Sequence, residues 1–109
     1  MYSLEDIKRR SESTDELIVN YTDALELLYL YENDNTEVIG WEGWIKSPDG
    51  SLTHSRRYQG KNDFFRMSKT STIALIKSTI MQSYVEWDER PEVNGADLLY
   101  CIKTCITSR

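Results

Sequence analysis

The clearest alternation of apolar and polar residues runs from residue 37 to residue 60 and predicts a β-hairpin. Its turn is Ser47-Pro48-Asp49-Gly50, in which proline presets the backbone for a type I turn and glycine suits the exit. A four-residue loop of this kind places Lys46 opposite Ser51, and the pairing of the two strands follows by counting outward. We therefore expect two antiparallel strands joined at this turn.

The two faces of this hairpin differ in polarity. The face that carries Trp41 and Ile45 is the more apolar, so we expect it to meet the core near the turn. Trp44 lies among polar neighbours on the other face and is expected to be partly exposed. It is either covered by a loop or the N-terminal segment, or it is an aromatic anchor in a binding surface. Gly40 and Gly43 flank the tryptophans, which indicates a bulge or the close approach of another backbone.

A helix is predicted from Ser71 to about Trp87, with Ser68 or Thr70 as its cap and Pro91 marking its end. Apolar residues recur along it at helical spacing. These are Ile73, Ile76, Ile80, Tyr84 and Trp87. Because burial of each such side chain contributes about 1.5–3 kcal/mol, we expect this helix to be the main stabilising element.

The segment Ala24–Glu32 has apolar residues on both faces of its alternating pattern, as an interior strand or a helix would have. Its two tyrosines and the Asn33-Asp34-Asn35 turn that follows favour a strand. Such a strand would pair with Val38–Lys46 and make a three-stranded antiparallel meander.

The C-terminal segment Asp97–Thr107 is rich in β-branched and aromatic residues and is predicted to be the last strand. A helix is the alternative, because Leu98, Ile102 and Cys105 also align at helical spacing. In a strand, Cys101 and Cys105 share one face and stand about 13 Å apart at roughly 3.3 Å per residue. That separation excludes a disulfide between them.

A capping pattern predicts that a helix begins near Leu4, and a polar stretch at residues 11–14 breaks it. A second short helix from Asp15 to about Tyr21 follows, with one bent helix as the alternative. The chain is then an α+β fold with the order α-β-β-β-α-β. We expect a single small domain over residues 1–109, with an antiparallel sheet of about four strands in meander hairpins and helices packed on one face.

The composition is that of one folded domain. With 109 residues, 39% of them hydrophobic and 28% charged, the chain is able to bury one modest core. No apolar run approaches the roughly 20 residues of a membrane helix, and the N-terminus lacks the apolar core of a signal peptide. We therefore expect a cytoplasmic protein without a membrane partner.

Candidate catalytic chemistry is sparse. His54 is the only histidine and lies in the middle of a predicted strand, and neither cysteine stands at a helix N-terminus, where its pKa would fall. One histidine and two cysteines are fewer than the four ligands of a structural zinc site, and no glycine-rich phosphate loop is present. We predict no catalytic residue, no metal and no cofactor, and we expect that the protein is not an enzyme.

The distribution of charge is uneven along the chain, whose net charge is −5. Residues 1–42 include eleven acidic and three basic side chains, whereas residues 43–85 include two acidic and seven basic ones. Such an asymmetry is a hint about partners. A fold can also bring the two signs together and neutralise them.

The first functional hypothesis is a non-enzymatic protein-binding module, such as a regulatory, inhibitor or immunity-type protein. Its partner, another protein, would meet an acidic surface and exposed aromatic residues of the hairpin, and electrostatic complementarity would speed association. The candidate partner-binding residues are Glu12, Asp15, Glu16 and Trp44. An exposed strand edge would also permit a homodimer.

The second hypothesis is nucleic-acid binding, with RNA as the ligand. Basic residues interleaved with aromatic ones on a sheet can contact phosphates and stack on bases. The candidate residues are Arg56, Arg57, Tyr58, Lys61, Arg66 and Lys69. An isoelectric point near 4.8 argues against a dedicated nucleic-acid binder, so this hypothesis ranks second.

Overall fold

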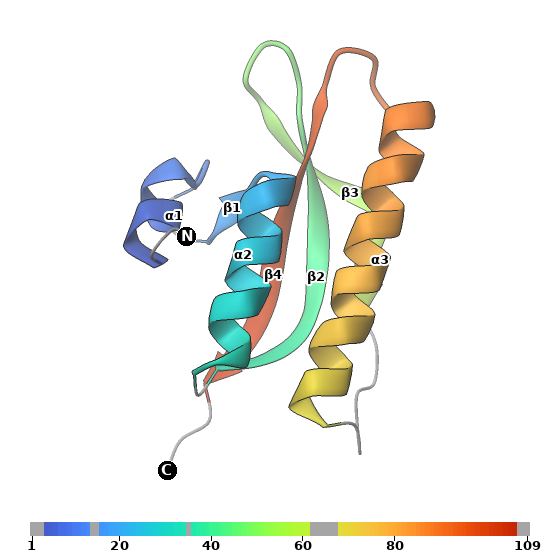
Figure 1. The fold of residues 1–109 in the computed structure, drawn as a ribbon. Helices are drawn as coiled ribbons and strands as arrows, with labels where there is room; N and C mark the ends of the chain where they lie inside the picture. Colours follow the sequence, from blue (N-terminus) through green and yellow to red (C-terminus); the bar gives the residue numbers. More distant parts are fainter. Residues whose placement is uncertain (1–3, 14–15, 35, 62–67, 107–109) are drawn as a thin grey trace.

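Within residues 4–13, 16–34, 36–61 and 68–106, which the structure describes, the chain forms three helices and four strands. In order these are α1 (Leu4–Arg10), β1 (Ile18–Val19), α2 (Tyr21–Glu32), β2 (Thr36–Lys46), β3 (Leu52–Lys61), α3 (Lys69–Glu89) and β4 (Asp97–Ile106). Figure 1 shows this computed structural model, with α2 and α3 packed on the same face of the sheet. The predicted α+β class is confirmed.

The sheet is antiparallel throughout, and its strand order is β1-β4-β2-β3. β4, the last strand in the sequence, therefore lies in the interior between β1 and β2. It pairs with β2 from Asp97 opposite Lys46 to Ile106 opposite Thr36. The predicted C-terminal strand is confirmed, and β3 forms one edge of the sheet. The predicted meander is wrong, because β4, and not the segment Ala24–Glu32, is the second partner of β2.

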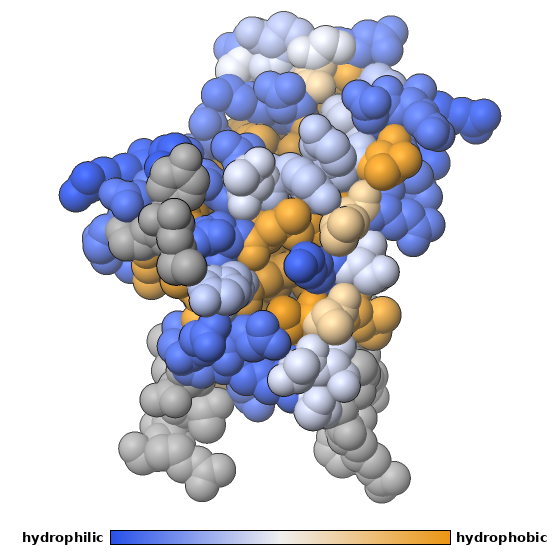
Figure 2. All heavy atoms as spheres, viewed as in Figure 1, coloured by the Kyte–Doolittle hydropathy of each residue, from blue (hydrophilic) through white to orange (hydrophobic). Residues whose placement is uncertain are grey.

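The main core lies between the sheet and the helices α2 and α3. Ser68 caps α3 by accepting a hydrogen bond from the Ser71 N–H at 3.1 Å, as predicted. Tyr84 belongs to the predicted apolar stripe of α3, but it is 48% exposed and stacks on Tyr21 instead. The buried members of the stripe are Ile73, Ile76, Ile80 and Trp87. On this side of the molecule, apolar side chains gather between the two helices (Figure 2).

The segment Ala24–Glu32, predicted to be a strand, is helical and forms most of α2. The Asn20 side chain caps this helix by accepting a hydrogen bond from the Asp23 N–H at 2.8 Å. Its buried apolar residues recur at spacings of three and four, so one helical face covers the sheet. They are Ala24, Leu27, Leu28 and Tyr31. Burial of this face outweighs the β-propensity of the tyrosines.

A short strand replaces the second helix predicted from Asp15 to Tyr21. This strand, β1, consists of Ile18–Val19 and pairs with Cys101 and Tyr100 of β4. The helix predicted to begin near Leu4 is confirmed as α1. The order of elements is therefore α-β-α-β-β-α-β, and the predicted order α-β-β-β-α-β is corrected at two places.

The hairpin turn is confirmed, but its loop is one residue shorter than predicted. The Ser47 N–H donates to the Ser51 carbonyl at 2.9 Å, and Gly50 has a φ of 90°. This is the three-residue loop in which a glycine in the left-handed conformation follows a type I turn. The shift of one residue places Leu52 on the face that carries Trp44.

Trp41 and Trp44 lie on opposite faces of β2 as predicted, but Trp44 has apolar neighbours, Leu52 and Leu99 among them, where polar ones were expected. Trp41 and Ile45 are buried in the main core, and the Trp41 indole N–H donates to Thr79 Oγ1 at 2.9 Å. Trp44 is half-buried on the other face. Alternation along β2 therefore sends its two tryptophans to opposite sides of the sheet.

The irregularities predicted at Gly40 and Gly43 are present. The pairing of β2 shifts register against β4 next to Gly40 and against β3 at Gly43. A Cβ atom on Gly43 would lie 2.5 Å from the carbonyl oxygen of Tyr58, so the two backbones approach too closely for any other residue. This glycine fixes the local path of β2 just before Trp44.

Candidate functional site on the open face of the sheet

The face of the sheet that α2 and α3 leave uncovered carries a second apolar cluster. Successive side chains of a strand point to opposite faces, so Leu99 and Cys101 lie on the side away from Leu98 and Tyr100, which belong to the main core. We call this second group the open-face cluster. It draws on every strand and consists of buried Ile18, Leu99 and Cys101 with half-buried Trp44 and Leu52.

Ion pairs connect the segment before β1 to the strands beside this cluster. Lys46 Nζ at the end of β2 lies 2.8 Å from Glu12 Oε1, and Lys103 Nζ on β4 lies 2.7 Å from Glu16 Oε1. These pairs join acidic residues of the N-terminal third to cations of later segments. The fold therefore neutralises part of the charge asymmetry along the sequence.

Trp44 lies on an interior strand, next to further polar groups of this face. The His54 ring meets the Trp44 ring edge-on, with centroids 5.2 Å apart and planes at 87°. His54 Nε2 lies 3.5 Å from Glu42 Oε2, and Glu42 Oε1 lies 3.2 Å from Lys103 Nζ. The Trp44 indole nitrogen is buried and has no acceptor among the described residues. Because a buried donor without a partner costs about 1–3 kcal/mol, stability alone does not account for tryptophan at this position.

The charge state of two groups on this face follows from their surroundings. The hydrogen bond to Glu16 raises the pKa of Lys103, and this effect exceeds the opposing effect of burial. Lys103 therefore remains a cation at neutral pH. Burial raises the pKa of the Cys101 thiol to about 11, so this cysteine is mostly a neutral thiol at neutral pH.

In the folded protein at neutral pH, Cys105 is expected to react with iodoacetamide while Cys101 stays unmodified. Cys105 is exposed and Cys101 is buried. In addition, burial raises the pKa of the Cys101 thiol, so less of it is present as the reactive thiolate at neutral pH. Timed labelling followed by peptide mapping by mass spectrometry measures both sites, and labelling in denaturant provides the control in which both react. Equal rates in the folded protein would contradict the burial of Cys101.

The structure gathers the described partner-binding candidates on one side of the sheet. Trp44 belongs to the open-face cluster, and Glu12 and Glu16 hold ion pairs with the lysines beside it. Asp15 lies outside the described residues. Residues that are distant in the sequence thus lie on the same side of the sheet.

The structure supports fewer members of the basic cluster of the second hypothesis. Tyr58 is 3% exposed and packs against Trp87 in the main core, so its ring is unable to stack on a base and it leaves this candidate set. The Arg57 guanidinium lies 5.3 Å from the centre of the Tyr58 ring, and Lys69 donates to the Asp34 carbonyl. The side chains of Arg56 and Lys61 lie outside the described part of the structure, and so does the whole of Arg66.

Sequence reasoning missed several members of this face, above all Lys103, Glu42 and Leu99. A signal was available for Lys103, which is the only charged side chain between residues 98 and 106. A charge within an apolar strand requires a partner of opposite charge. The sequence does not show which acidic residues lie close to Lys103 in the fold.

Searches for a metal site, a membrane-spanning helix and similar proteins give negative results for the described residues or the chain. Among the described residues no group of three or more histidine, cysteine or carboxylate side chains is placed to hold a metal ion. None of the helices in the described ranges is long and apolar enough to cross a membrane. Comparison with family models, curated proteins and solved structures finds no match to this chain.

Proposed function

We propose that this chain is a non-enzymatic protein-binding module of regulatory or inhibitor type, whose partner protein docks on the open face of the sheet. The observation that carries the proposal is half-buried Trp44 within an apolar cluster, on the side of the sheet opposite the two packed helices. Tryptophan is enriched among the residues that dominate the binding energy of protein interfaces.

The surroundings of Trp44 match the anatomy of such an interface. Protein interfaces combine an apolar centre with a polar and charged rim. The open-face cluster supplies the apolar centre, while the ion pairs of Glu12 and Glu16 with their lysines supply the rim. Rim charges of this kind steer association and reject mismatched partners more than they deepen affinity.

Affinity capture with a pair of aromatic variants tests the proposal. The bait is incubated with a lysate of the source organism, with and without nuclease, and captured proteins are identified by mass spectrometry. Trp44→Ala is expected to reduce capture of the partner protein at least about tenfold, because an anchor residue is removed from the centre of the interface. Tyr29→Ala is the matched control, since Tyr29 is 48% exposed on α2 and far from the open-face cluster in the fold.

Circular dichroism first establishes that both variants are folded. Capture of the same protein by Trp44→Ala at the wild-type level would contradict docking on the open face. Loss of all captured proteins after nuclease treatment would contradict protein binding itself and favour the nucleic-acid hypothesis.

A further inference from the structure

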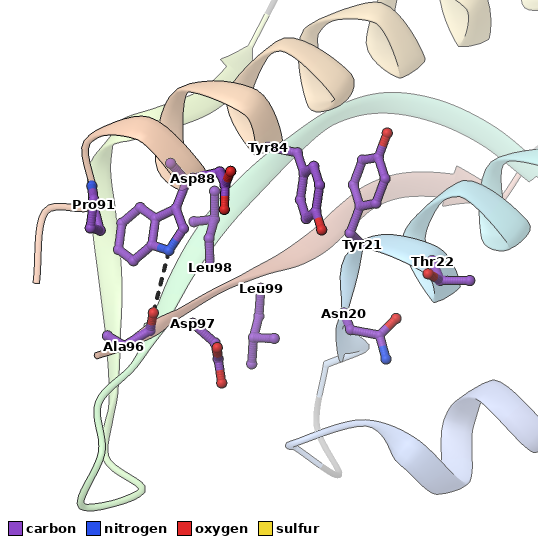
Figure 3. A pocket seen from close by; sticks show the side chains of 11 residues that line it. Asn20, Tyr21, Thr22, Tyr84, Asp88, Pro91, Ala96, Asp97, Leu98 and Leu99 are labelled. Atoms are coloured by element: carbon purple, nitrogen blue, oxygen red, sulfur yellow. Dashed lines mark hydrogen bonds between the residues drawn. The ribbon is translucent and has the colours of Figure 1, made fainter. Parts of the chain in front are cut away.

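A separate pocket of about 460 Å³ lies where the start of α2, the end of α3 and the start of β4 meet (Figure 3). Its main walls are Tyr21, Tyr84, Trp87, Asp88, Asp97 and Leu99. We infer that this pocket binds an arginine side chain carried by an extended segment of a partner protein. The pocket shares Leu99 with the open-face cluster, but Trp44 does not line it, so the inference is tested with variants other than Trp44→Ala.

The aromatic wall suits a flat cation. The Tyr21 and Tyr84 rings stack with centroids 4.0 Å apart and planes at 15° (Figure 3). Tyr84 is 48% exposed, whereas Tyr21 also meets the buried Tyr100 ring at 6.1 Å. The Trp87 indole N–H is already bonded to the Ala96 carbonyl at 3.3 Å, which leaves the ring as an apolar wall. A guanidinium stacks on aromatic faces and is more weakly hydrated than an ammonium, so it enters such a site at lower cost.

Two carboxylates make the pocket negatively charged. Asp88 on α3 and Asp97 on β4 both line it, and both side chains are exposed. Neither forms an ion pair with a described residue, whereas Glu12 and Glu16 on the open face are each matched by a lysine. None of the described residues that line the pocket is a lysine, arginine or histidine. The charge that complements this pocket is therefore positive, and a guanidinium is able to hydrogen-bond a carboxylate through two parallel N–H groups.

The neighbouring strand edge points to a polypeptide as the carrier of that cation. β1 pairs with only two residues of β4, Tyr100 and Cys101. Beside Asp97–Leu99, therefore, no described strand pairs with the outer edge of β4, and the chain turns from Val19 through Asn20 into α2 at this point. Residues Asp97–Leu99 also line the pocket. An extended segment can add main-chain hydrogen bonds to such an edge while one of its side chains enters the adjoining pocket.

This assignment is tested by titrating the full chain with short capped peptides. Binding is monitored in ¹H–¹⁵N correlation spectra. The probe is acetyl-Gly-Arg-Gly-amide, and the comparison peptides carry lysine or the neutral isostere citrulline in place of arginine. We expect saturable shifts at the amides of Thr22, Asp88 and Leu99 with the arginine peptide. Binding of the lysine peptide is expected to be at least about fivefold weaker, because the planar fork is lost, and binding of the citrulline peptide is expected to vanish.

Charge-neutral variants separate this pocket from general attraction to an acidic protein. Asp88→Asn combined with Asp97→Asn is expected to weaken binding of the arginine peptide at least about tenfold, since both negative charges that line the pocket are removed. Glu89→Gln is the matched control, because Glu89 is an exposed acid on α3 that does not line the pocket. Its binding should equal that of the unchanged protein.

Three results would overturn the assignment. The first is a set of shifts that does not saturate or that spreads evenly over acidic surfaces. The second is equal loss of binding in Glu89→Gln and in the double variant. The third is binding of free arginine as tightly as the peptide, because the strand edge would then contribute nothing and the ligand would be a small cation.

Discussion

Replacing Ile80 with alanine is expected to lower the free energy of unfolding by about 3–4 kcal/mol. Ile80 is 0% exposed and lies on α3 in the main core, between the helix and the sheet. Its truncation removes buried apolar surface and leaves a cavity that tightly packed neighbours fill only in part. Denaturation in urea measures the loss, and the slope of the transition should stay unchanged because the surface exposed on unfolding barely changes.

Leu75→Ala is the matched control for this prediction, because Leu75 lies on the same helix and is 39% exposed. Its loss is expected to stay below about 1 kcal/mol. Equal losses for the two variants would contradict the orientation of α3 on the sheet.

Gly43→Ala is expected to cost about 2–3 kcal/mol, which is large for the addition of one methyl group. The new Cβ would lie 2.5 Å from the Tyr58 carbonyl oxygen and 3.0 Å from the Tyr58 Cβ. Because the closest atom belongs to the backbone, β3 itself has to move away from β2. Since Gly43 directly precedes Trp44, the same displacement is expected to disturb the open-face cluster.

Urea denaturation measures this cost, and tryptophan fluorescence reports the local displacement. Thr53→Ala serves as the control on the neighbouring strand, because Thr53 is exposed on β3 near the turn. Its effect should stay within about 1 kcal/mol, the range of β-propensity differences. A stability of Gly43→Ala equal to that of the unchanged protein would contradict the close approach of the two strands.

The strand β4 contributes to both proposed binding surfaces. Leu99 belongs to the open-face cluster and also lines the pocket between the helices. Asp97 lines the pocket but does not belong to the open-face cluster. β4 is held along its whole length by β2, so both surfaces rest on an interior strand. Sites built on paired strands hold their side chains more firmly than sites on loops do.

Local patterns in the sequence determined α3 and the position of the hairpin turn, and they favoured a strand over a helix for the C-terminal segment. Ile73, Ile76 and Ile80 recur at a helical period after the capping residue Ser68, and this pattern has no competing strand interpretation. The glycines beside the tryptophans indicated the strand irregularities, because glycine within a strand often marks a bulge or the close approach of another backbone. The polarity around Trp44 placed it on the less apolar face of the hairpin.

The segment Ala24–Glu32 shows where local pattern was insufficient. Its apolar residues satisfy both the helical and the alternating period, so the sequence alone left two structures open. Packing decided between them: the helical face of Leu27 and Leu28 covers the sheet, and β4 occupies the place beside β2 that the predicted meander gave to this segment. The register of the hairpin has a local cause instead, because the positive φ of Gly50 closes a three-residue loop.

Both candidate sites are products of tertiary structure. Glu16 and Lys103 stand 87 positions apart in the sequence and meet across the edge of the sheet, and the pocket joins segments from the start of α2 to the start of β4. The sequence determined which side chains are apolar, charged or able to cap and turn, because those properties act within a few residues. Only the tertiary structure decided which of them are neighbours, because contacts between distant segments depend on how the whole chain packs around one core.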